Sequence, residues 1–90
     1  MKIAVIGTGY VGLVTGVCFA ALGNTVIGVD SDAEKIRRLR AGESPIYEPG
    51  LSELLAANLQ RRRIGFTSNL QDAVDRCEIL IIAVGTPQNP

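Results

Sequence analysis

In this 90-residue chain, the segment Ile6-Gly7-Thr8-Gly9-Tyr10-Val11-Gly12 is the strongest indication of the fold. It follows residues 2–6, a short β-branched run that is typical of a buried strand. It leads into residues 11–22, whose apolar spacing predicts a helix that ends at Gly23-Asn24. A strand that turns through spaced glycines into a helix is typical of a pyrophosphate-binding turn.

The glycines have different physical roles in such a turn. We expect Gly7 to allow the tight turn itself, and Gly9, which has no Cβ, to let the backbone approach a pyrophosphate. Gly12 would let the helix pack closely on the strand. The backbone N–H groups of Tyr10 and Val11 would hold the phosphates at the positive end of the helix dipole.

A carboxylate, Asp30, follows the second predicted strand, residues 25–29. At this distance from the glycines, such a carboxylate accepts hydrogen bonds from the adenine-ribose hydroxyls of a dinucleotide. It would repel a 2′-phosphate, and neither Ser31 nor Asp32 supplies the arginine that a 2′-phosphate needs. NAD is therefore the expected cofactor, in preference to NADP.

The helix after Asp30 is expected to start at a capping box, Ser31-x-x-Glu34. Because Ser31 would then cap the helix, Asp30 is free to face a ligand, and the alternative that Asp30 is only a cap is disfavoured. Lys35 lies in the first turn of this helix, close to Asp30. On spacing alone, Lys35 would be a solvated charge.

The rest of the chain alternates helices with short apolar strands. We expect a helix to residue 40, a Pro-containing loop over 43–50, a helix over 51–62, a strand over 64–67, a helix from the capping box Ser68-x-x-Gln71 to near Cys77, and a strand over 79–84. Short apolar strands separated by helices form a parallel sheet covered on both faces. Right-handed crossovers predict a Rossmann-type, doubly wound α/β fold with strand order 3-2-1-4. Such folds continue with more strands, so residues 1–90 are expected to be a partial N-terminal domain, truncated after about four strands.

Composition excludes other classes of protein. Nine basic and nine acidic residues cancel, which leaves no electrostatic case for a nucleic-acid partner. The basic run Arg61-Arg62-Arg63 is expected to be a solvated helix end. Residues 3–29 carry no charge, but glycines interrupt the apolar run. We therefore expect neither a membrane span nor a signal peptide, and a cytoplasmic chain.

The chain has no histidine and two cysteines. No histidine base lies within these residues, and the spacing of Cys18 and Cys77 fits neither a disulfide framework nor a metal site. We expect both cysteines to be small buried apolar residues. In the first helix, the face expected to point inward carries Val14, Val17, Cys18 and Ala21.

The last predicted strand, residues 79–84, leads to two expectations. Ligands of open α/β sheets bind outside the carboxyl ends of the strands, where Gly85 would permit close approach and Thr86 would offer a hydroxyl. On position alone, a plain turn residue before Pro87 is an equal alternative for Thr86. The strand would also be an uncovered sheet edge, which invites pairing, so self-association or a homo-oligomer is expected.

Four motifs together resemble the N-terminal segment of the UDP-glucose/GDP-mannose dehydrogenase family. The glycine motif is shared by many dehydrogenases, whereas the loop motif and the final motif are much more specific. Their order and spacing fit over the whole chain. The motifs are MKIAVIGTGYVGLV at 1–14, VDSDAEK at 29–35, PIYEPGL at 45–51 and AVGTP at 83–87.

The resemblance implies an NAD-dependent, two-step oxidation of a sugar-nucleotide primary alcohol to a carboxylate, as from UDP-glucose to UDP-glucuronate for polysaccharide biosynthesis. It implies that Val11, Asp30, Lys35 and Thr86 contact NAD, with Lys35 as a ribose-hydroxyl partner. It also places the catalytic cysteine, the catalytic lysine and the UDP-sugar site in later regions of the family's chain. No cysteine here inherits that role, and these residues alone are not expected to be active.

Two other functions stay open at this point. One is a dehydrogenase for another sugar nucleotide or a hydroxyacid, against which the specific loop at 45–51 argues. The other is a non-catalytic NAD-binding module, which predicts that the natural chain ends near residue 90. The role of residues 47–50 is also open, since they are either a part of the cofactor's surroundings or a rigid lead-in to the next helix.

Overall fold

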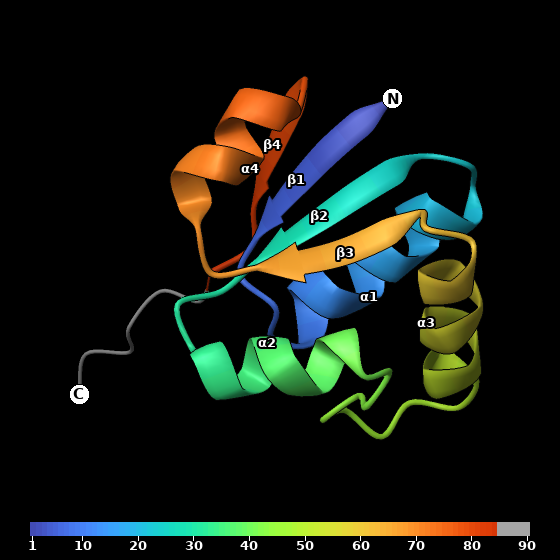
Figure 1. Cartoon of the computed structure of the whole chain (residues 1–90). Helices are drawn as coiled ribbons and strands as arrows, with labels where there is room; N and C mark the ends of the chain where they lie inside the picture. The colour runs from blue at the N-terminus through green and yellow to red at the C-terminus, as the bar shows by residue number, and fades with distance from the viewer. Residues whose placement is uncertain (85–90) are drawn as a thin grey trace.

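The structure, a computed structural model, describes residues 1–84. Strands and helices alternate along most of the chain, and Figure 1 shows the strands side by side with helices in front and behind. The elements in chain order are β1 (Lys2–Ile6), α1 (Tyr10–Ala21), β2 (Thr25–Val29), α2 (Ala33–Arg40), α3 (Leu51–Gln60), β3 (Ile64–Thr67), α4 (Leu70–Arg76) and β4 (Ile79–Ile82).

The strands form one parallel sheet in the order β3-β2-β1-β4, which confirms the predicted order and the predicted Rossmann-type fold. In the centre of the sheet, Ile3 pairs with Val26 on one side and with Ile79 on the other. Because every pair is parallel, the carboxyl ends of the strands meet at one edge of the sheet. The glycine turn and Asp30 therefore lie at the same edge.

The strands alternate their side chains between two apolar layers. Ile3 and Val5 belong to the larger layer, with buried side chains from α1, α2 and α3. Ala4 and Val29 belong to the smaller layer, where Ala73 of α4 covers them. Figure 1 shows α4 on the opposite side of the sheet from α1 and α3. The sheet is thus covered on both faces, as the apolar strands predicted.

Two helices begin one residue later than the capping boxes predicted. Asp32, not Ser31, caps α2, because its Oδ1 accepts hydrogen bonds from the backbone N–H groups of Glu34 and Lys35. Asn69, not Ser68, caps α4 by accepting from the N–H of Asp72. A side chain caps a helix when it reaches the N–H groups two or three residues ahead, and in both cases the second of two adjacent polar residues does so.

The inward face of α1 also differs from the prediction. The buried residues of the helix are Gly12, Leu13, Gly16, Val17 and Ala20. Cys18 is exposed and Cys77 is only half-buried, so the expectation of two buried cysteines was wrong. The small residues at every fourth position, 12, 16 and 20, allow this side of the helix to approach the sheet, and that rotates Cys18 and Ala21 toward solvent.

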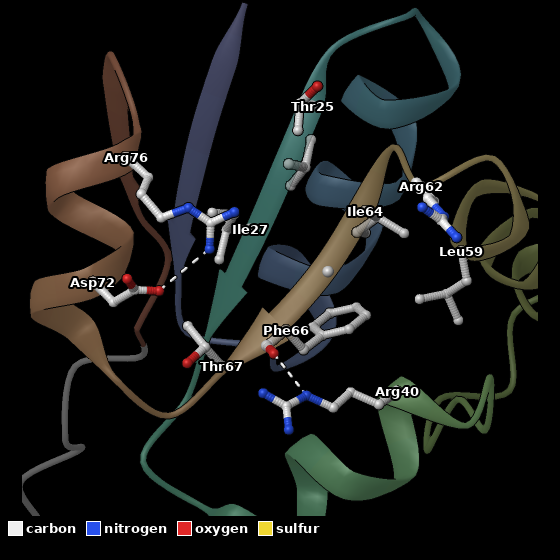
Figure 2. A pocket seen from close by; sticks show the side chains of 12 residues that line it. Thr25, Ile27, Arg40, Leu59, Arg62, Ile64, Phe66, Thr67, Asp72 and Arg76 are labelled. Carbon is white, nitrogen blue, oxygen red and sulfur yellow. Dashed lines mark hydrogen bonds and ion pairs between the residues drawn. The ribbon is translucent and has the colours of Figure 1, made fainter.

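Basic side chains from neighbouring segments border the free edge of β3, beside a cavity of about 330 Å³ (Figure 2). The Nε of Arg40 donates a hydrogen bond to the backbone oxygen of Phe66 at 2.9 Å, which occupies one acceptor of the strand's free edge. Arg76 pairs with Asp72 at 3.3 Å on the other side of the strand. Charged side chains at an edge strand oppose pairing with another chain. This cavity lies along the strand, away from the glycine turn.

Within residues 1–84, no helix is both long and apolar enough to cross a lipid bilayer. The uncharged run at residues 3–29 is instead divided among β1, α1 and β2, because the backbone turns at Gly7 after β1 and at Gly23 after α1.

Candidate functional site

A cleft of about 240 Å³ lies where the carboxyl ends of the strands meet. Gly7 and Asp30 line it from the turns after β1 and β2, and Leu70 lines it from the start of α4. Ile6, Val29 and Val84 add apolar surface, and Ser31 and Ser68 add hydroxyls at the rim. An apolar cleft with one carboxylate suits a flat aromatic ring that is joined to a sugar.

The glycine turn has the backbone geometry that its sequence predicts. Gly7 has a φ of 103°, a conformation that favours glycine over any residue with a Cβ. A Cβ added to Gly12 would overlap the carbonyl oxygen of Gly7, so the second half of the turn also requires glycine. A Cβ added to Gly9 would meet nothing within 4 Å, because Gly9 borders open space.

The N-terminus of α1 faces this open space beside Gly9. Gly9 is the helix cap but provides no side-chain hydrogen bond to the first turn, and the first intrahelical bond runs from the N–H of Leu13 to the oxygen of Gly9. The backbone N–H groups of Tyr10 and Val11 precede that bond and have no acceptor one turn earlier in the helix. Both residues are exposed, so this helix N-terminus lies at the surface, where its backbone donors suit an anion.

Asp30 is held by four hydrogen bonds. Its Oδ2 accepts from the hydroxyl of Thr8 at 2.7 Å, from the N–H of Thr8 at 3.2 Å, and from the Nζ of Lys35 at 3.2 Å. Its Oδ1 accepts from the N–H of Asp32 at 3.0 Å. Burial raises the pKa of Asp30, but these hydrogen bonds outweigh burial and lower the pKa to about 2, so the carboxylate is ionised at neutral pH.

Lys35 lies where the sequence predicts, in the first turn of α2 and beside Asp30. Its ammonium forms an ion pair with Asp30 and stays partly exposed at the mouth of the site. On spacing alone it would have been a solvated charge, so the ion pair is what distinguishes it from an ordinary surface lysine. Lys35 can donate further hydrogen bonds to a ligand, since an ammonium has three donors.

Thr8 is a residue of the site that the sequence analysis above does not predict. Only 2% of its surface is exposed, and it joins the glycine turn to Asp30 through both its hydroxyl and its N–H. One feature of the sequence could have indicated Thr8. It is a hydroxyl residue between two glycines of the turn after β1, and β1 ends beside β2, the strand that precedes Asp30. The contact links residues 22 positions apart, however, so only the paired β1 and β2 bring them together.

The loop before α3 lies beside α2, the helix that carries Lys35. Lys35 and Tyr47 line one cavity of about 360 Å³, together with Arg38, Glu43, Ser44 and Pro45. The Tyr47 side chain is fully exposed, whereas Ile46 next to it packs against the larger apolar layer. Gly50 then caps α3 with a φ of 81°. The loop thus serves as an anchored lead-in to α3 and also places an aromatic side chain near Lys35.

Two further expectations concern Thr86 and the cysteines. Thr86 lies outside the described residues. Among residues 1–84 there is no group of three or more acidic, cysteine or histidine side chains that could hold a metal ion. Burial raises the pKa of the Cys77 thiol, which disfavours the reactive thiolate.

Comparison with known proteins gives a consistent result. The sequence profile of the UDP-glucose/GDP-mannose dehydrogenase family, NAD binding domain, matches residues 1–90. The UDP-glucose 6-dehydrogenase TuaD of Bacillus subtilis is 53% identical over 88 residues, which are 98% of this chain and 19% of that protein. The GDP-mannose 6-dehydrogenase of Azotobacter vinelandii is 45% identical over 87 residues, 97% of this chain and 20% of that protein. The chain therefore spans about a fifth of the length of the relatives that it matches.

Solved structures agree with the sequence comparison. A ternary complex of GDP-mannose dehydrogenase from Pseudomonas aeruginosa superposes with a TM-score of 0.95 at 43% identity, over 99% of this chain and 20% of that one. A UDP-glucose dehydrogenase from Pyrobaculum islandicum superposes with a TM-score of 0.93 at 45% identity, over 99% of this chain and 21% of that one. With its glycine turn, its ionised Asp30 and these matches, the chain belongs to the UDP-glucose/GDP-mannose dehydrogenase family, as its NAD-binding domain.

Proposed function

We propose that this chain binds NAD for a UDP-glucose 6-dehydrogenase, an enzyme that oxidises UDP-glucose to UDP-glucuronate. The proposal rests above all on the ionised carboxylate of Asp30, fixed beside the glycine turn and next to an apolar cleft. Residues 1–90 are then one part of a longer enzyme, whose substrate site and catalytic groups lie in other residues. Bound NAD supplies the hydride acceptor for the oxidation.

Each group of proposed binding residues contacts a different part of the dinucleotide. Gly7 and Gly12 shape the turn, Gly9 leaves open space for the pyrophosphate, and the N–H groups of Tyr10 and Val11 donate to it. Asp30 accepts from the adenine ribose, and Lys35 donates to a neighbouring hydroxyl of the same sugar. The apolar cleft beside Leu70 takes the adenine ring. Thr86 is proposed as a further NAD contact on its motif alone.

UDP-glucose is the proposed substrate because the identity to UDP-glucose 6-dehydrogenases reaches 53%, against 45% for a GDP-mannose 6-dehydrogenase. GDP-mannose is the second candidate, because a GDP-mannose dehydrogenase is a structural match at a TM-score of 0.95. The test is to assay the complete protein that contains this domain with each sugar nucleotide while NADH formation is followed. Faster turnover of GDP-mannose than of UDP-glucose would contradict the first choice.

Replacement of the ribose carboxylate tests the cofactor site directly. Asp30→Ala should weaken NAD binding by about tenfold or more, because a hydrogen bond to a charged group is worth about 1.5–3 kcal/mol. The fold should persist, since the side chain is at the rim of the sheet and not in either apolar layer. Calorimetric titration with NAD measures the affinity, and circular dichroism checks the fold. The same NAD affinity in Asp30→Ala as in the unaltered chain would exclude Asp30 as the ribose acceptor.

A further inference from the structure

Thr8 holds one particular oxygen of the Asp30 carboxylate. A carboxylate offers about four acceptor positions, two on each oxygen. Oδ2 already receives three donors, which are the hydroxyl and the N–H of Thr8 and the ammonium of Lys35. Oδ1 receives only the N–H of Asp32. Oδ2 is filled, because its three donors exceed its two positions, whereas Oδ1 has one donor for two positions, so the open acceptor position belongs to Oδ1.

The Thr8 hydroxyl also restricts the rotation of the carboxylate. Its oxygen lies 2.7 Å from Oδ2, the shortest of the contacts that Asp30 makes. Thr8 itself is 2% exposed, so its side chain is packed in place. Rotation of the carboxylate out of its present plane would break the hydrogen bonds from Thr8 to Oδ2 and from Asp32 to Oδ1, so these bonds hold that plane. The direction of the free acceptor is thus set before a ligand arrives.

We propose that Thr8 is a positioning residue for cofactor binding, whose hydroxyl fixes Oδ2 of Asp30 so that Oδ1 accepts one hydroxyl of a vicinal diol while Lys35 donates to the other. The inference rests on the proposed function, because the diol is that of the adenine ribose of NAD. It goes beyond that function in assigning a task to a residue that does not contact the ligand itself. The backbone N–H of Thr8 is present whatever residue occupies position 8, so the hydroxyl is the part that the side chain adds.

Two substitutions separate the hydroxyl from the shape of the side chain. Thr8→Val keeps the volume and removes the donor, whereas Thr8→Ser keeps the donor and removes a methyl group. Thr25→Val serves as a matched control, because Thr25 is an exposed threonine at the opposite end of the neighbouring strand. Circular dichroism verifies the fold, and Thr8→Ala replaces Thr8→Val if the valine variant does not fold.

Two readouts are taken on each variant of the chain. NAD affinity is measured by titration followed through backbone amide NMR signals, and the pKa of Asp30 through the pH dependence of its carboxyl carbon signal. Thr8→Val should weaken NAD binding by about tenfold and raise the pKa of Asp30 toward its ordinary value, because it removes a donor to the ionised form. Thr8→Ser and Thr25→Val should leave both quantities as in the unaltered chain.

The outcomes distinguish this inference from the proposed function. If the unaltered chain binds NAD and Thr8→Val binds it equally well, or leaves the pKa of Asp30 unchanged, the positioning role is overturned while the NAD site stands. A Thr8→Ser variant that loses affinity as Thr8→Val does would also overturn it, since the methyl group and not the hydroxyl would then matter. If the unaltered chain binds no NAD at all, the proposed function fails. A raised pKa of Asp30 in Thr8→Val would then show only that the Thr8 hydroxyl donates to Asp30, and the role of Thr8 in cofactor binding would fail with the proposed function.

Discussion

At the scale of single residues, the glycines of the turn are constrained for different reasons. Gly12 is constrained by the protein itself, since its missing Cβ leaves space that the Gly7 carbonyl oxygen occupies. Gly9 has open space in the same position and an ordinary negative φ of −72°. Glycine would therefore be required at position 9 only by a ligand that approaches the backbone from outside the chain. This contrast makes the two residues separable by experiment.

We predict that Gly12→Ala and Gly9→Ala have different effects. Gly12→Ala should destabilise the fold by about 3 kcal/mol or more, because backbone must move to admit the Cβ. Gly9→Ala should change stability by only about 1 kcal/mol, mainly through the helix cap, but should strongly weaken NAD binding. Urea unfolding and NAD titration measure the two effects. Tight NAD binding by a folded Gly9→Ala variant would contradict the assignment of the open space to the pyrophosphate.

The ionised state of Asp30 predicts a pH dependence of stability. Its pKa is about 2 in the folded chain and near 3.8 when unfolded, so its contribution is complete above about pH 4 and is lost as the pH falls toward 2. The shift corresponds to about 2 kcal/mol as an order of magnitude, since one pKa unit is about 1.4 kcal/mol. Glu34, whose pKa its partner Arg37 also lowers to about 2, titrates over the same range.

The comparison of the unaltered chain with Asp30→Asn isolates this contribution from that of Glu34. Between about pH 4 and pH 2, the free energy of unfolding should fall less steeply in Asp30→Asn than in the unaltered chain. Urea unfolding at a series of pH values gives the two slopes. Parallel curves across this range would mean that Asp30 has the same pKa in the folded and unfolded states.

At the scale of secondary structure, helix starts are decided by which of two adjacent polar residues turns toward the first N–H groups. We predict that Asp32→Ala destabilises the chain by about 1 kcal/mol, whereas Ser31→Ala changes stability by less than about 0.5 kcal/mol. Asp32 caps α2 through two N–H groups, while Ser31 is exposed and lies before the cap. Thermal unfolding of the two variants makes the comparison. A larger effect for Ser31→Ala would show that Ser31 caps the helix, as the capping box in the sequence suggests.

At the scale of the whole molecule, the two edges of the sheet differ. The β3 edge is guarded by Arg40, whose side chain occupies the Phe66 oxygen (Figure 2). The β4 edge pairs only with β1 among the described residues, and it exposes Ile79, Leu80 and Ile82, the last of them at 67%. An exposed apolar edge without charged residues favours association with another chain.

We predict that this chain self-associates through β4. Ile82→Lys should reduce the association, because a charge on an edge strand opposes edge-to-edge pairing. Arg40→Ala serves as the opposite test at β3, where loss of the guarding side chain should increase association. Light scattering over a range of concentrations measures both. An unaltered chain that stays monomeric at high concentration would contradict the prediction.

Features of the fold that depend on neighbouring residues could be predicted from the amino-acid sequence. Apolar period and glycine spacing predicted the strands, their order and the turn before α1. The location of Asp30 beside the glycine turn was also predicted from its position after β2, since parallel strands bring their carboxyl ends to one edge.

Features that depend on contacts between distant segments could be seen only in the folded chain. The bond from Thr8 to Asp30 joins residues 22 positions apart and needs β1 and β2 in register. The exposure of Cys18 follows from which side of α1 approaches the sheet, and this depends on small residues meeting a surface built by other strands. Local pattern gives each segment its form, whereas packing of one segment on another selects which side chain points inward and which donor reaches which acceptor.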